Sequence, residues 1–234
     1  MSGFACVILA LLTFAGPVVT LLFIFDRRKR AVKPVIAGIL TYIIAEAGIR
    51  LPLLAILGYN TADNTAWIIF CTATGAFIVE IIRYFVIKFI IIKKSGMPSG
   101  AMLYFAGFAC AYVFLVWGID ALSTAALVLI KDFALIEQGE LWTEIVTVPI
   151  VLLLHFGYTV LLMLAIINKQ KLYIAACVLF RIITEKEAIF RLCEIYGLGS
   201  GVAVFYLAVA ACAGFLLLYK KFTMLKGIEG YEEN

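Results

Sequence analysis

The chain has 234 residues, of which 65% are apolar and only 15% are charged, and its formal net charge is +4. Soluble domains are about 45–50% apolar and about 25% charged, so a water-exposed surface could not accommodate this composition. The sequence therefore predicts one integral membrane domain over residues 1–234 and excludes an intrinsically disordered chain, a fibrous protein and a disulfide-stapled secreted domain.

Apolar runs bounded by charged or turn residues predict about seven membrane-spanning helices. The first run, Phe4–Phe25, has no basic residue before it and is followed by Arg27–Arg30, which indicates a retained anchor with its N-terminus outside. Each spanning helix needs about 20 apolar residues, and most of the runs reach that length. The predicted spans are residues 4–25, 34–57, 66–92, 101–119, 145–167, 172–184 and 198–219.

The basic residues predict the orientation of this helical bundle. Most of the 19 lysines and arginines fall in clusters on one predicted side, which is typical of the positive-inside rule and not of a nucleic-acid-binding surface. We therefore expect the N-terminus outside and the C-terminus inside, in a bacterial cytoplasmic membrane. Residues 120–136 are apolar but contain Lys131 and Asp132, which predicts a re-entrant or interfacial helix after the fourth span. Residues 185–197 are expected to form an amphipathic segment outside.

Ionisable side chains inside the predicted spans are the candidates for function. A charge in the hydrocarbon core costs several kcal/mol unless it is paired or hydrated, so such residues are functional candidates by default. We expect the following residues to line a cavity inside the bundle: Glu46 and Arg50 in the second span, Glu80 and Arg83 in the third, Asp120 and Arg181 near the outer ends of theirs, and His155 in the fifth.

The spacing of these residues predicts ion pairs. Glu46 and Arg50 are four residues apart, and Glu80 and Arg83 are three apart, so each pair shares a helix face. Counting about 1.5 Å per residue from the span ends places Glu46, Glu80 and His155 at a similar depth. They could converge on one polar cavity. Alternatively, the pairs only lock helices together, the histidine only bonds between helices, and the arginine of the sixth span extends to the outer surface.

Three stretches carry a resemblance to a known family. Pro17–Leu54 contains a proline-bearing first helix, a basic loop and a second helix closing on GIRLPLL, and Ala76–Tyr84 reads AFIVEIIRY. The third is the order of helices through His155 to a lysine-bearing loop. Over about residues 10–180 the chain resembles the YhfC-type intramembrane metalloproteases, relatives of the CAAX-prenyl-protease-like membrane enzymes. The resemblance implies a zinc ion, with Glu80 and His155 as catalytic residues or ligands and Asp120 or Glu46 as a further ligand.

The chain departs from the pattern of that family at most of its metal-binding positions. Val79 stands where the first glutamate of E-E-x-x-R-Y is expected, and Ile119 and Ser123 replace the histidine and glutamate of G-H-G-x-x-E. Arg181 lies near the place of a further histidine, and His155 is the sole histidine of the chain. A catalytic zinc site usually has three protein ligands. We therefore expect a degenerate member, a pseudoenzyme without a metal or other cofactor.

Three functions agree with these observations. The first is a non-catalytic membrane protein that binds a hydrophobic or lipidated peptide, or that acts as the membrane partner subunit of a complex such as a transporter. The second is an active, metal-dependent intramembrane peptidase with unusual zinc ligands. The third is a small carrier or permease whose charged pairs line a path, although we find no internal repeat of the kind that many carriers show. In each case the lipid bilayer is the surrounding medium and no nucleic-acid partner is expected.

Overall fold

In the computed structural model, all regular elements in the described part of the chain are helices. That part comprises residues 8–9, 11–20, 32–59, 64–92, 99–118 and 138–232. The labelled elements, with η for π-helical stretches, are η1 (Leu11–Ala15), α3 (Val32–Thr41), η3 (Tyr42–Arg50), α4 (Leu51–Ile56), α5 (Thr65–Val86), η5 (Ile87–Ile92), α7 (Ser99–Val113), η6 (Phe114–Gly118), α9 (Gln138–Ile167), α10 (Leu172–Thr184), α11 (Lys186–Ile195) and α12 (Ser200–Glu232). The predicted all-α class is confirmed for these residues.

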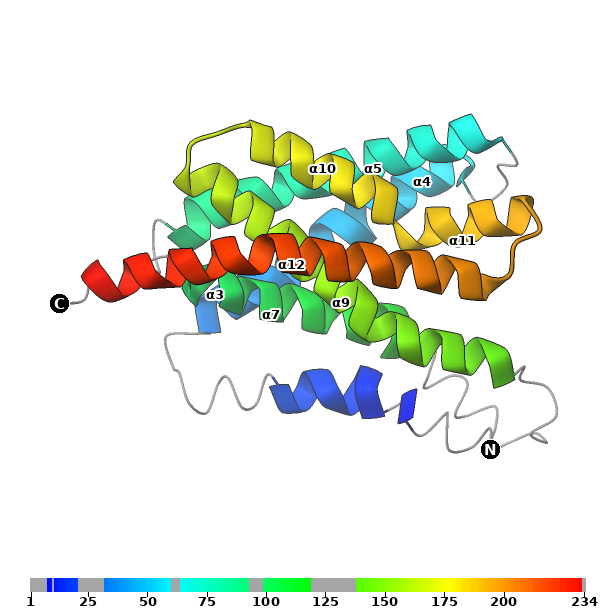
Figure 1. The fold of residues 1–234 in the computed structure, drawn as a ribbon, viewed down its shortest axis with the longest axis horizontal. Coiled ribbons are helices and arrows are strands. Elements are labelled where there is room, and N and C mark those ends of the chain that lie inside the picture. Colours follow the sequence, from blue (N-terminus) through cyan, green and yellow to red (C-terminus); the bar gives the residue numbers. More distant parts are fainter. Residues whose placement is uncertain are drawn as a thin grey trace.

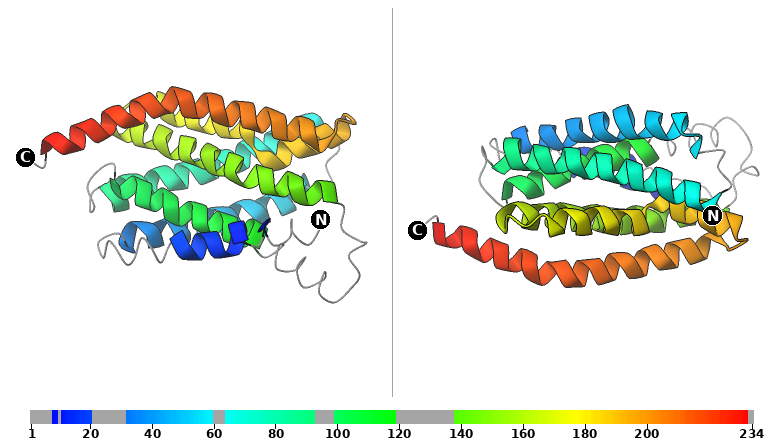
Figure 2. Two further views of the ribbon diagram at one scale, coloured as in Figure 1. Left: turned by 60° about the horizontal axis from the view of Figure 1, so that its bottom comes forward. Right: turned by 90° about the horizontal axis from the view of Figure 1, so that it is seen from above.

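The long helices lie side by side along one axis (Figures 1 and 2). α10 packs between α5 and α9, and α12 covers α9 from the other side. Helix ends predicted to face the same side of a membrane lie at the same end of the bundle (Figure 1). The beginnings of α3 and α10 and the C-terminal end of α12 lie at one end, and α4, α11 and the N-terminal end of α9 lie at the other. This antiparallel arrangement is the one that short connections between successive helices favour.

Four helices are long and apolar enough to cross a membrane, within the described ranges: Val32–Ile56, Gly100–Gly118, Thr143–Ile167 and Ser200–Leu218. They correspond to the second, fourth, fifth and seventh predicted spans. The third predicted span corresponds to the continuous helix from α5 through η5, and the sixth predicted span corresponds to α10, which has 13 residues. Of the first span, the structure describes Leu11–Thr20 as a shorter apolar helix. The predicted re-entrant segment, residues 120–136, lies outside the described residues.

Close contact between two backbones joins α3 to α7. A Cβ atom added to Gly38 would lie 2.1 Å from the carbonyl oxygen of Tyr104, and one added to Gly107 would lie 2.0 Å from that of Val35. Only glycine fits at such distances, because a real side chain would overlap the neighbouring backbone. Small residues at helix crossings are typical of membrane bundles, where close packing drives association.

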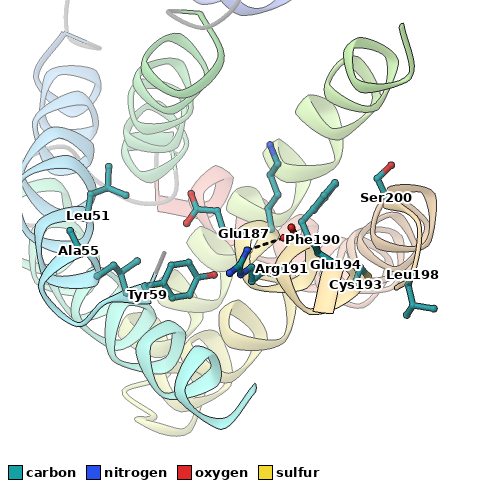
Figure 3. Close-up of a pocket in the computed structure, with 12 residues that line it drawn as sticks. Leu51, Ala55, Tyr59, Glu187, Phe190, Arg191, Cys193, Glu194, Leu198 and Ser200 are labelled. Atoms are coloured by element: carbon teal, nitrogen blue, oxygen red, sulfur yellow. Dashed lines mark hydrogen bonds and ion pairs between the residues drawn. The ribbon is translucent and has the colours of Figure 1, made fainter. Parts of the chain in front are cut away.

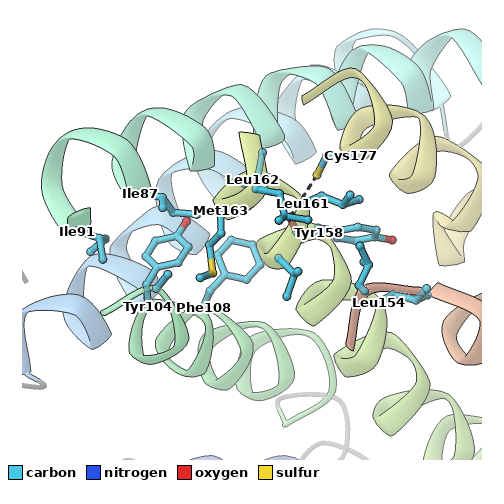
Figure 4. Close-up of a cluster of buried hydrophobic side chains, with 14 of the residues drawn as sticks. Ile87, Ile91, Tyr104, Phe108, Leu154, Tyr158, Leu161, Leu162, Met163 and Cys177 are labelled. Carbon is cyan, nitrogen blue, oxygen red and sulfur yellow. Dashed lines mark hydrogen bonds between the residues drawn. The ribbon is translucent and has the colours of Figure 1, made fainter. Parts of the chain in front are cut away.

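The apolar core lies between α7, α9, α10 and η5 (Figure 4). Tyr104, Phe108 and Leu162 are fully buried there. On the outside, large apolar side chains are exposed, including Phe205 and Leu216 of α12 at 72% and 74%. A soluble monomer rarely exposes such contiguous apolar surface, whereas lipid tails would cover it.

A nine-residue π-helical stretch, η3, interrupts the helix that runs from Val32 to Ile56. It contains Glu46 and Arg50, and both side chains are buried. π-Helical segments inside α-helices are rare and occur frequently at functional sites. The fold therefore places an irregular backbone segment and two charged residues together in the interior.

Candidate functional site

The charged residues of the predicted spans meet where η3, α5 and α10 pack together. Glu46, Arg50, Glu80, Arg83 and Arg181 are between 0% and 5% exposed. Burial of ionised groups is tolerated only where they are paired and hydrogen-bonded. The contacts of these five residues show how they are paired.

Arg181, near the C-terminal end of α10, is the centre of this network. Its Nη1 donates a hydrogen bond of 2.7 Å to Glu80 Oε1, and its Nη2 donates to Glu46 Oε1. Its Nε donates to Glu185 Oε2 at 3.2 Å. The prediction that Glu46 and Glu80 converge is thus confirmed. The alternative that Arg181 extends to the outer surface is wrong, because this side chain is 2% exposed and bonds to three carboxylates.

Both ion pairs predicted from helical spacing are confirmed. Arg50 Nη1 lies 3.2 Å from Glu46 Oε2, and Arg83 Nη1 lies 2.9 Å from Glu80 Oε1. Arg83 is further held by Thr159 of α9, whose hydroxyl oxygen accepts from Nη2 at 2.6 Å. The network therefore connects α9 with η3, α5 and α10.

Sequence reasoning missed two members of the network, Glu185 and Glu187. Arg50 Nη2 donates to Glu185 Oε1 at 2.9 Å and to Glu187 Oε2 at 3.2 Å. Residues 185–197 were expected only as an amphipathic outer segment, and α11 does have that pattern. One signal was present in the sequence: Glu185 lies four residues after Arg181, the spacing of an intrahelical ion pair.

The connected network contains four carboxylates and three guanidinium groups among the described residues. Glu187 is its most exposed member, since 45% of its side chain is accessible against 12% for Glu185. Burial raises the pKa of the Glu187 carboxyl, with Arg50 opposing this shift and the Glu185 carboxylate adding to it. Glu187 therefore lies at the edge of the network, where its carboxylate is the one most accessible from outside.

His155 lies beside the network but is surrounded by aromatic rings. Its ring centroid is 4.6 Å from that of Tyr112 and 5.4 Å from those of Phe108 and Tyr158. Its Nδ1 is buried and has no hydrogen-bond partner. A histidine that ligates a metal almost always donates its other ring N–H to an acceptor that fixes the ring. The packing of His155 is that of an aromatic core residue.

The donor set of the predicted zinc site is not assembled in the described residues. Within them, no group of three or more histidine, cysteine, aspartate or glutamate side chains is placed to hold a metal ion. Glu46 and Glu80 are both bonded to Arg181, and Asp120 lies outside the described residues. The catalytic roles of Glu80 and His155 remain predictions that these contacts do not favour.

A small cavity of about 20 Å³ adjoins the network. Its polar lining includes Arg50, His155, Arg181, Glu185 and Glu187, and it has room for about one water molecule. The sequence predicted a polar cavity inside the bundle that could hold a ligand. The cavity in the structure is small, because the long arginine side chains occupy the space between the helices.

A much larger cleft, of about 810 Å³, opens at the same end of the bundle (Figure 3). Leu51, Leu54 and Ala55 of α4 form one wall, and the other consists of α11 and the beginning of α12. Lys186 and Glu187 line both this cleft and the small inner cavity. The cleft therefore reaches the edge of the buried network.

The geometry defines a helical bundle of membrane-protein character with a buried arginine–carboxylate network and an adjoining cleft. No protein-family model matches the chain, and no similar curated protein or solved structure is found. The function must therefore be argued from the network and the cleft, and the resemblance to YhfC-type proteins stays a hypothesis.

Proposed function

We propose that the chain is an integral membrane protein of about seven spans, with its N-terminus outside and its C-terminus inside, in a bacterial cytoplasmic membrane. Four long apolar helices and the exposed apolar side chains of α12 support the membrane location. The basic clusters support the orientation. In this arrangement the cleft lies at the outer end of the bundle.

The function that the geometry favours is binding, without catalysis, of a hydrophobic or lipidated peptide, either free or as a segment of a membrane partner subunit. The observation that carries this proposal is the cleft of about 810 Å³. Ligand pockets usually enclose about 300–1,000 Å³ and combine apolar walls with a few polar groups. Here Leu51, Leu54 and Phe190 would contact an apolar chain, while Lys186 and Glu187 would contact polar groups of the peptide.

The chemistry of the buried carboxylates supports a non-catalytic role. A general base must have a lone pair available to the proton that it removes. Glu46 is bonded to Arg50 and Arg181, and Glu80 to Arg83 and Arg181. The three guanidinium groups would also repel a divalent cation. These residues do not fit a zinc site, so we derive no hydrolytic step from them.

A matched pair of substitutions tests the binding proposal. Ala55 lines the cleft, and Ala213 is an exposed alanine of α12 away from it. We expect Ala55→Trp to fill the cleft and to weaken the binding of a fluorescent farnesylated peptide at least tenfold, which corresponds to about 1.4 kcal/mol. Ala213→Trp should leave the affinity unchanged. Binding is measured by fluorescence anisotropy with the protein in lipid nanodiscs.

The binding measurement, a cleavage assay and a transport assay together separate the three functions. Equal affinity in the wild type and both variants would contradict binding in the cleft. Cleavage of the peptide by a preparation that contains stoichiometric zinc would instead establish the metalloprotease alternative. Accumulation of a solute in liposomes that contain the protein, without peptide binding, would support a carrier.

A further inference from the structure

An apolar groove of about 450 Å³ lies between two helices, the one that runs through α3 and η3 and the one that runs through α5 and η5. These helices lie side by side (Figure 2). One wall presents Ile36, Leu40 and Ile44, which follow one another at intervals of four residues and are between 44% and 54% exposed. Val86 and Ile90 belong to the opposite wall. An apolar chain in this groove would therefore contact side chains from both helices.

One end of the groove is cationic. Lys33, at the beginning of α3, is exposed and lines the groove. Among the described residues, no carboxylate forms an ion pair with it. The hydroxyl group of Thr41, farther along the same wall, donates to the carbonyl oxygen of Ala37 at 2.6 Å. The groove thus offers apolar contacts along its length and one available positive charge at its end.

The sequence around this end is basic and contains no acidic residue. Residues 27–45 and 81–119 contain five and four lysines or arginines, respectively, and neither stretch contains an aspartate or a glutamate. In the orientation proposed above, Lys33 faces the inner leaflet. Anionic lipids of that leaflet attract basic residues near the membrane surface, and basic pockets between spanning helices bind their headgroups. The charge of this end therefore complements an anionic headgroup.

The length of the groove matches the thickness of one leaflet. Lys33 and Ile44 both line it, and at about 1.5 Å per residue they are about 16 Å apart along the helix axis. The hydrocarbon core of a bilayer is about 30 Å thick, so one leaflet contributes about 15 Å. An acyl chain whose headgroup lies beside Lys33 would therefore end near Ile44, close to the middle of the bilayer.

We propose that this groove binds one anionic phospholipid of the inner leaflet, with its phosphate beside Lys33 and one acyl chain between the two helices. The inference rests on the proposed function only for the membrane location and the orientation, and not for the peptide-binding cleft. A second apolar cavity, of about 630 Å³, lies between Leu11–Thr20, α7 and α9, and its described lining contains no charged residue. That cavity offers contacts to an acyl chain but nothing that selects an anionic headgroup.

Native mass spectrometry of the protein in detergent micelles tests the selection of the headgroup. Phosphatidylglycerol and phosphatidylcholine with identical acyl chains are compared. We expect the wild type to bind phosphatidylglycerol about fivefold more tightly, which corresponds to about 1 kcal/mol, the attraction of one lysine to an anionic lipid surface. Lys33→Gln should abolish this preference. Lys88→Gln should retain it, because Lys88 is also an exposed lysine at this end of α5 and η5 but does not line the groove. Glycerol 3-phosphate, which has no acyl chain, should not bind measurably.

A matched pair of tryptophan variants tests the binding of the acyl chain. Leu40 lines the groove, whereas Ile43 lies three residues later, is 42% exposed and does not line it. We expect Leu40→Trp to fill the groove and to weaken the binding of both lipids at least tenfold, and Ile43→Trp to leave it unchanged. Retention time in size-exclusion chromatography checks that each variant remains folded.

Four results would overturn the proposal. The first three are equal affinity of the wild type for the two lipids, a preference that survives in Lys33→Gln, and undiminished lipid binding in Leu40→Trp. The fourth is a wild-type dimer that Leu40→Trp dissociates, because a second copy of the chain would then occupy the groove.

The lipid site and the peptide-binding cleft can fail separately. Peptide binding that Ala55→Trp weakens, without any preference between lipids, would refute the lipid site and leave the proposed function in place. A lipid preference that Lys33→Gln abolishes would establish the lipid site even if no peptide bound. Extraction of membranes with alkaline carbonate tests the shared premise, since release of the protein into the supernatant would contradict the membrane location and with it both proposals.

Discussion

Replacement of Arg181 by methionine should destabilise the protein strongly. Methionine roughly preserves the length of the side chain but removes the donors to Glu46, Glu80 and Glu185. Removing one partner of a buried ion pair costs about 3–5 kcal/mol, because the other charge stays buried without compensation. Arg50 and Arg83 still neutralise part of that charge, so we expect a loss within this range and not beyond it.

Thermal unfolding in detergent measures this loss. A cost of about 3–5 kcal/mol corresponds to a decrease in Tm of roughly 6–20 °C for a domain of this size. Arg191→Met is the matched control, because Arg191 pairs with the exposed Glu194 at 3.0 Å and surface pairs contribute about 0–1 kcal/mol. Adding Glu46→Gln to Arg181→Met should recover part of the stability. Equal effects of Arg181→Met and Arg191→Met would refute the view that Arg181 is the centre of the network.

Two further substitutions probe the packing around the network. Gly107→Ala should separate α3 from α7 and lower the Tm by several degrees, because the new Cβ atom would lie 2.0 Å from the carbonyl oxygen of Val35. Gly199→Ala is the control: the space around Gly199 is open, so this substitution should have little effect on the melting curve. Thr159→Val should cost about 1–3 kcal/mol in equilibrium unfolding, since it leaves the Nη2 donor of Arg83 without its 2.6 Å acceptor. An unchanged unfolding curve in Thr159→Val would mean that another acceptor replaces the hydroxyl.

The parts of the fold that the sequence predicts are those that depend on local pattern. Apolar runs of sufficient length place the helices, and α10 begins and ends at the predicted residues, 172 and 184. Spacings of three and four residues identify the pairs Glu46–Arg50 and Glu80–Arg83. These signals are contained within one helix, so no knowledge of the tertiary structure is needed to interpret them.

Helix ends were less predictable where charged residues occur inside a helix. The fifth span was predicted to begin at residue 145, and the apolar span does begin close by, at Thr143, but the helix that contains it, α9, begins earlier, at Gln138. Glu144 lies in the early turns of that helix, accepts a hydrogen bond from Trp117 Nε1 and lies 3.2 Å from Lys186 Nζ. Acidic residues are favourable near a helix N-terminus. Hydropathy alone starts such a helix too late, because it treats every charge as a boundary.

The roles of Arg181 and Glu187 depend on contacts between distant segments. Arg181 is 135 residues from Glu46 and 101 from Glu80, so nothing in its own neighbourhood shows that it lies between them. The Arg181 guanidinium lies between the carboxylates of Glu46 and Glu80 and carries its charge permanently. A cation on α10 therefore holds that helix to η3 and α5, and it does so through contacts that no local sequence pattern contains.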